Sequence, residues 1–128
     1  MVQLRSLVRI ADNSGCFLAQ CIGFFKKKSK LKVGDVLVLS IKGVYSFSSL
    51  KKGDVTFGVL VRTVKEFSIY TGDYIKFSEN SVILLNSLFI PQFNRILGPF
   101  CLEFWPRSNR KNFQRNYFRV ISIGSFFV

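Results

Sequence analysis

The residue types that could support catalysis are few in this chain. Its 128 residues include no histidine, so Ser-His-Asp and Cys-His arrangements are impossible and the commonest general base is missing. Nothing in the spacing of Glu66, Glu79 and Glu103 brings two carboxylates together, and we expect lone glutamates of this kind to face solvent. No GxxxxGK phosphate loop occurs. We therefore predict a protein that is not an enzyme and that needs no cofactor.

The cysteines do not indicate a metal site or a disulfide framework. There are three, Cys16, Cys21 and Cys101, and an odd number without any histidine suits neither role. We predict small core residues in a reducing compartment. No apolar run approaches the about 18 residues of a membrane span, and Arg5 and Arg9 interrupt any signal-peptide pattern. The expectation is a chain without membrane insertion.

Charge is the strongest functional signal from composition. Nineteen Lys and Arg against seven Asp and Glu give a net charge of +12. The stretch "KKKSKLK" over 26–32 and the whole of 106–128 contain basic residues and no acid. Such an excess implies a polyanionic partner. Nucleic acid is the preferred reading, and an anionic membrane surface is the alternative.

Regularly spaced glycines divide the chain into strand-like stretches. Gly15, Gly34, Gly53 and Gly72 lie 19 residues apart, and the last three precede aspartate. Glycine supplies the positive φ of tight turns, and Asp and Asn favour turns, so we interpret these sites as corners and not as acidic catalytic groups. The apolar stretches between them predict strands: Val2–Ala11, Cys16–Phe25, Asp35–Val44, Asp54–Val64, Tyr74–Phe77 and Ser81–Leu85.

Strands of this kind without intervening helical patterns favour an all-β fold, a small closed antiparallel barrel, because closure removes apolar strand edges. Asn13-Ser14-Gly15 would be its first hairpin corner. After Asn86 the sequence becomes loop-like, and 109–123 predicts a short helix against the barrel. We expect a single domain over 1–128, with the barrel and its loops in 1–100 and a basic C-terminal extension in 101–128.

Six blocks of the sequence carry a resemblance to a known family. They are "ADNSGC" (11–16), "VGDVLVLSIK" (33–42), "KKGDV" (51–55), "GVLVRT" (58–63), "IKFSENSVILLN" (75–86) and "RILGPF" (95–100). In order and spacing they resemble the L-fourteen family of large-subunit ribosomal proteins. The resemblance implies a five-stranded barrel that binds large-subunit rRNA at the subunit interface. It also implies an intersubunit bridge to small-subunit rRNA, neighbouring large-subunit proteins as partners, and docking of a ribosome-silencing factor.

The matching blocks place candidate RNA contacts on individual residues. The candidates are Lys42, Lys51, Lys52, Arg62, Thr63 and Arg95. Asn13 and Ser14 match too, but a corner bonded to its own backbone is as good a reading as RNA contact. The loop 64–72 has only Lys65 as a basic residue, opposed by Glu66, and is expected to have lost an RNA contact. The stretch 106–116 resembles an insertion that adds four further candidates: Arg107, Arg110, Lys111 and Arg115.

Composition also suggests where the protein works. Fifteen phenylalanines, with many Lys, Ile, Asn and Ser, indicate a gene under A+T pressure. The family pattern begins at the very first residues, so we expect no transit peptide. We expect an organelle-encoded protein of the mitochondrial matrix, in the large subunit of the mitochondrial ribosome, with plastid or bacterial cytoplasm as alternatives. The rival hypothesis from another class is a free-standing cationic barrel that binds anionic membrane or single-stranded nucleic acid.

Overall fold

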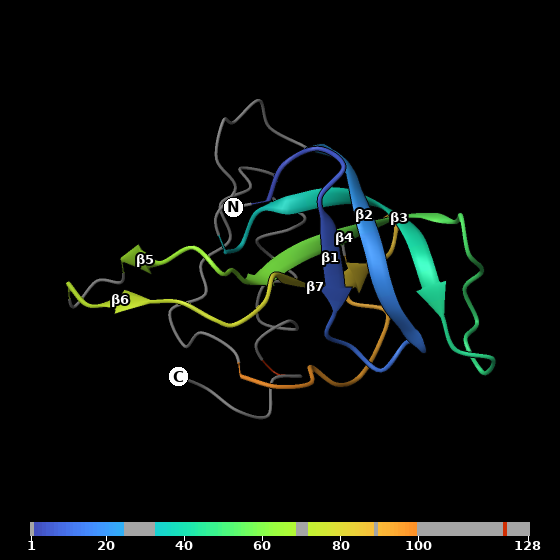
Figure 1. Cartoon of the computed structure of the whole chain (residues 1–128). Coiled ribbons are helices and arrows are strands. Elements are labelled where there is room, and N and C mark those ends of the chain that lie inside the picture. The colour runs from blue at the N-terminus through green and yellow to red at the C-terminus, as the bar shows by residue number, and fades with distance from the viewer. Residues whose placement is uncertain (1, 25–32, 69–71, 89, 100–121, 123–128) are drawn as a thin grey trace.

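The computed structural model describes residues 2–24, 33–68, 72–88, 90–99 and 122. Five strands close into a barrel, and a short two-stranded hairpin projects from one side of it (Figure 1). The barrel strands are β1 (Leu7–Ile10), β2 (Cys16–Phe24), β3 (Val36–Val44), β4 (Val55–Arg62) and β7 (Ser81–Leu85). The hairpin strands are β5 (Phe67–Ser68) and β6 (Tyr74–Ile75). The predicted all-β class and the closed five-stranded barrel are confirmed.

One strand pair differs from the expected antiparallel barrel. Neighbours run antiparallel in the order β1-β2-β3-β4-β7, but β1 and β7 are parallel, with Arg9 opposite Ser81 and Ile10 opposite Val82. The reason is geometric: when an odd number of strands alternates in direction, the first and the last point the same way. The ladder between β1 and β7 includes only two residue pairs, fewer than any other ladder of the barrel.

Alternating side chains fill the barrel interior, as period-two strands require. The buried cluster takes Leu37, Leu39 and Ile41 from β3 and Val82 and Leu84 from β7. Cys16 and Cys21 belong to the same cluster and are free and buried, as expected of core residues. Burial raises the pKa of the Cys21 thiol. Cys101 lies outside the described residues.

The glycine corners are confirmed by the backbone. Gly15, Gly34, Gly53 and Gly72 all have positive φ, between 85° and 95°. The first predicted strand is shorter than expected, because Arg5 also adopts a positive φ of 67° and breaks the extended run. Strand β5 was not expected, since a loop was predicted over 64–72.

The segment after β7 folds back over the outside of the barrel. Pro91 bridges Leu85, and Ile96 bridges Asp12. All five residues of β7 are buried, including those that alternate away from the interior. The loop predicted after Asn86 thus pairs with the end of the closing strand and with the first corner. The predicted helix over 109–123 lies outside the described residues except for 122, and the single-domain division stays a prediction.

No helix in the described part of the chain is long and apolar enough to cross a bilayer.

Asp12 holds the seam where β1 meets β7. Its carboxylate is 4% exposed and accepts two backbone hydrogen bonds, from Leu84 N at 2.9 Å and from Ser14 N at 3.1 Å. Burial raises its pKa above the ordinary value of 3.8, although its hydrogen bonds, with Ser14 and from Leu84 N, oppose the shift. The aspartate therefore joins the first corner to the last strand.

Asp12→Ala should lower the free energy of unfolding by at least about 2 kcal/mol, because two buried backbone N–H groups lose their acceptor at about 1–3 kcal/mol each. Urea unfolding followed by circular dichroism measures this. The neighbouring Asn13→Ala is the control: Asn13 is exposed and accepts one hydrogen bond, from Asn94 N. We expect it to cost less than about 1 kcal/mol, and equal losses in the two variants would contradict the role of Asp12.

The pH dependence of the conservative variant Asp12→Asn refines this prediction. Because the folded-state pKa lies above 3.8, the stability that Asp12 contributes is largest below 3.8 and is lost as pH rises through the folded-state value. Asparagine does not titrate, so wild type should exceed Asp12→Asn by more near pH 4 than at neutral pH. If the difference in unfolding free energy between wild type and Asp12→Asn became smaller toward acid pH, the pKa of Asp12 would not be raised in the folded protein.

Candidate nucleic-acid interface

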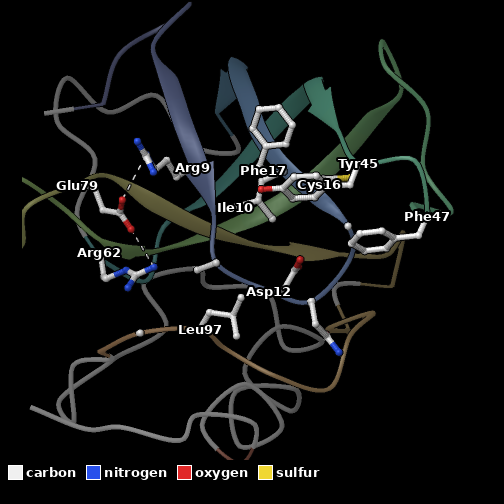
Figure 2. A pocket seen from close by; sticks show the side chains of 14 residues that line it. Arg9, Ile10, Asp12, Cys16, Phe17, Tyr45, Phe47, Arg62, Glu79 and Leu97 are labelled. Carbon is white, nitrogen blue, oxygen red and sulfur yellow. Dashed lines mark ion pairs between the residues drawn. The ribbon is translucent and has the colours of Figure 1, made fainter.

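An open groove of about 580 Å³ runs along β1 and the first corner. Figure 2 shows its two ends: Arg9, Arg62 and Glu79 at one, and the rings of Phe17, Tyr45 and Phe47 at the other. Asp12 and Leu97 lie between them. The groove thus has a charged end and an aromatic end.

A shared carboxylate organises the charged end. Glu79 Oε1 lies 3.2 Å from Arg62 Nη2, and Oε2 lies 3.4 Å from Arg9 Nε. Ser81 Oγ donates to Oε1 at 3.0 Å. The Glu79 side chain is only 33% exposed, so the expectation that it faces solvent is wrong. The pairing of β4 with β7 brings these groups together, since Arg62 lies opposite Ser81 in that ladder.

Arg62 is enclosed and Arg9 is not. The Arg62 side chain is 8% exposed, whereas that of Arg9 is 72% exposed. Burial lowers the pKa of the Arg62 guanidinium from its ordinary value, and the charge of Glu79 raises it in part. Among the described residues, no hydrogen-bond partner reaches the buried Arg62 Nε. Glu79 is therefore the carboxylate that balances an otherwise costly buried charge.

Gly98 makes room for the Arg62 guanidinium. A Cβ atom at position 98 would collide with Arg62 Nη1, and the glycine has a positive φ of 86°. The positive φ favours glycine here, and a side chain at this position would also have to displace the end of the Arg62 side chain. Sequence reasoning placed Arg62 and Gly98 in matching blocks but not in contact, because the contact depends on the segment that folds back after β7.

The structure distributes the other candidate RNA contacts as follows. Thr63 is 4% exposed, and its hydroxyl donates to Lys65 O at 2.8 Å. Four candidates are exposed: Lys42 on β3, Lys51 and Lys52 in the turn between β3 and β4, and Arg95 after β7. The candidates over 106–116 lie outside the described residues: Arg107, Arg110, Lys111 and Arg115. All of these assignments to RNA remain predictions.

The turn that carries Lys51 and Lys52 is locked at its base. Asp54 Oδ2 accepts from Lys51 N at 2.8 Å, and Asp54 N donates to Lys51 O at 3.1 Å. Gly53 N donates to Ile41 O at 2.8 Å. Two exposed lysines are thus carried by a fixed backbone. The connection between β3 and β4 lies on the side of the barrel opposite the β5–β6 hairpin (Figure 1).

Sequence reasoning missed the aromatic end of the groove. The Phe17 and Tyr45 ring centroids are 5.0 Å apart, and those of Tyr45 and Phe47 are 5.6 Å apart. The sequence carried no usable signal for Phe17, because regular alternation places it in phase with the buried Ala19 and Cys21, and only the irregular register after Cys16 exposes it.

A family model described as ribosomal protein L14p/L23e matches residues 1–126 of the chain. The chain belongs to the ribosomal protein L14p/L23e family. Membership implies a structural constituent of the large ribosomal subunit. In the part of the chain that the structure describes, no group of three or more His, Cys, Asp or Glu side chains could hold a metal ion.

Glu79→Gln should lower the free energy of unfolding by about 2 kcal/mol, because Arg62 would keep its charge in a buried place without a counter-charge. The magnitude lies between that of exposed pairs, about 0–1 kcal/mol, and that of broken buried pairs, about 3–5 kcal/mol, since Glu79 is partly exposed. Chemical denaturation measures the loss. Glu66→Gln, at an exposed position, should change stability by less than about 0.5 kcal/mol, and an equal effect at both sites would refute the role of Glu79.

Proposed function

We propose that this L14p/L23e-family protein binds large-subunit rRNA at the subunit interface and contributes to an intersubunit bridge. Fixed loops of the barrel neutralise phosphates and set the register of the RNA, as phosphate contacts do in other nucleic-acid complexes. The exposed residues Lys42, Lys51, Lys52 and Arg95 make these contacts. Arg107, Arg110, Lys111 and Arg115 extend them along the basic C-terminal stretch.

The observation that carries the proposal is that several acids make contacts within the protein, whereas lysines face solvent. Three described carboxylates are used inside the molecule: Asp12 and Asp54 accept backbone hydrogen bonds, and Glu79 pairs with arginines. Lysines on the locked turn face solvent instead. With a net charge of +12, this division leaves a cationic surface of defined shape.

Arg62 and Thr63 act differently within this proposal. Both are buried, so Arg62 reaches RNA only through the groove that it lines, and Thr63 fixes the backbone at Lys65. Their contribution is to fix the direction in which the neighbouring exposed cations point.

The location and the wider set of partners belong to the same proposal. The chain works in the large subunit of a mitochondrial ribosome, contacts neighbouring large-subunit proteins and small-subunit rRNA, and is a docking site for a ribosome-silencing factor. The support is the family match together with the composition.

The double variant Lys51→Ala/Lys52→Ala should weaken binding of the full chain to a large-subunit rRNA transcript. Each phosphate contact that is lost should reduce the slope of log affinity against log salt by about 1. Filter binding over a salt series measures both quantities. The matched control is Lys65→Ala, an exposed lysine next to Glu66, which should leave affinity and slope unchanged. If wild type, the double variant and Lys65→Ala had the same slope of log affinity against log salt, Lys51 and Lys52 would not contact RNA phosphates.

Sedimentation of a native organelle extract tests the ribosomal location. We expect the chain to migrate with the large subunit and with joined ribosomes, and to stay there at high salt, because purely electrostatic binding falls steeply with salt whereas an extensive interface does not. Mass spectrometry of gradient fractions follows the chain. Recovery at the top of the gradient or with membranes would favour the rival cationic barrel.

A further inference from the structure

Three aromatic rings stand exposed at one end of the groove. Phe17, Tyr45 and Phe47 have exposed fractions of 43%, 53% and 77%. Tyr45 and Phe47 stack with an interplanar angle of 6°, and Phe17 is tilted by 47° against Tyr45. Contiguous exposed rings of this kind mark an interaction surface.

The barrel fixes the position of Phe17. It is the extra residue of a β-bulge, since Cys16 lies opposite Val44 and Leu18 lies opposite Gly43. Bulges re-aim a side chain, and here the ring lies against the backbone of β3. A Cβ atom at Gly43 would lie 2.6 Å from that ring, so glycine provides the space that the ring occupies.

The turn that carries Tyr45 and Phe47 is tied to the first corner. Tyr45 N donates to Gly15 O at 2.7 Å, and Ser48 Oγ donates to Ser14 O at 3.3 Å. A Cβ atom at Gly15 would lie 2.9 Å from Ser48 Cα and 3.1 Å from the Phe47 ring. The rings are therefore arranged before any partner arrives, which reduces the entropic cost of binding.

We propose that Phe17, Tyr45 and Phe47 form a stacking platform for an unpaired base of rRNA. The proposal rests on the proposed function and names the part of the RNA that the groove takes. Flat rings with open faces suit the faces of bases. The same groove holds the Arg9 side chain, 72% exposed and oriented through Nε by Glu79, as a cation for the adjoining phosphate. The net charge of +12 on the whole chain favours RNA over a protein partner.

The test uses the full chain and a short single-stranded RNA that carries 2-aminopurine, a base whose fluorescence falls on stacking. Wild type should quench the probe. Phe47→Leu, which removes the ring at a largely exposed site, should weaken affinity about tenfold and abolish the quenching, with the salt slope unchanged because no phosphate contact is lost. Phe17→Leu should act in the same direction.

Two further variants separate stacking from general effects. Ile22→Ala, on β2 and 45% exposed but not part of the groove lining, should bind like wild type. Gly43→Ala should displace the Phe17 ring and reduce the quenching of the probe. In this background, Lys51→Ala/Lys52→Ala should still weaken RNA binding as much as it does in the wild-type chain. Thermal melting by circular dichroism confirms that each variant is folded.

The outcomes distinguish the platform from the proposed function. If Phe47→Leu and Phe17→Leu bind and quench like wild type while Lys51→Ala/Lys52→Ala binds weakly, the stacking platform is refuted and RNA binding stands, with the aromatic face left to a protein. If the wild-type chain has no affinity for RNA at any salt concentration, both proposals fail.

Discussion

The seam between the first and the last strand of the barrel depends on the Asp12 carboxylate. The parallel register of β1 and β7 covers only two residue pairs, so the seam would be weakly held without a further connection. Asp12 supplies it by accepting from Leu84 N and Ser14 N. The segment that folds back after β7 joins at the same place, since Leu97 N donates to Ala11 O. Three stretches of chain therefore meet at this seam, and the Asp12 carboxylate links two of them, the first corner and β7.

The same use of acids explains how the molecule keeps its surface cationic. A carboxylate that accepts backbone hydrogen bonds or balances a buried guanidinium is not available to neutralise surface lysines. Asp12, Asp54 and Glu79 are all engaged in this way. Stability and charge separation thus follow from one arrangement, in which Asp12 is buried and Glu79 is partly buried while Lys51 and Lys52 face solvent.

Features that depend on local sequence were predictable, and those that depend on strand order were not. The strands follow from apolar stretches of about the right length, and the corners follow from Gly15, Gly34, Gly53 and Gly72. Strand β5 has only two residues, too few for any alternation to be recognised. The contact of Glu79 with Arg62 needs the β4–β7 pairing, and the contact of Phe17 with Tyr45 needs the β2–β3 pairing together with its bulge. Neither pairing can be read from spacing along the chain.

On the proposed function, a single connection carries both kinds of RNA contact. The stretch 45–54 between β3 and β4 begins with Tyr45 and Phe47 near one end and carries Lys51 and Lys52 in the turn that leads into β4. Hydrogen bonds fix it at both ends, to the first corner through Ser48 and across its base through Asp54. Phosphate contacts position an RNA strand but carry no information about its bases. A base stacked at one end of a rigid connection is held in a fixed relation to the phosphates bound at the other end, so the locked geometry selects an unpaired base at a defined place in the strand.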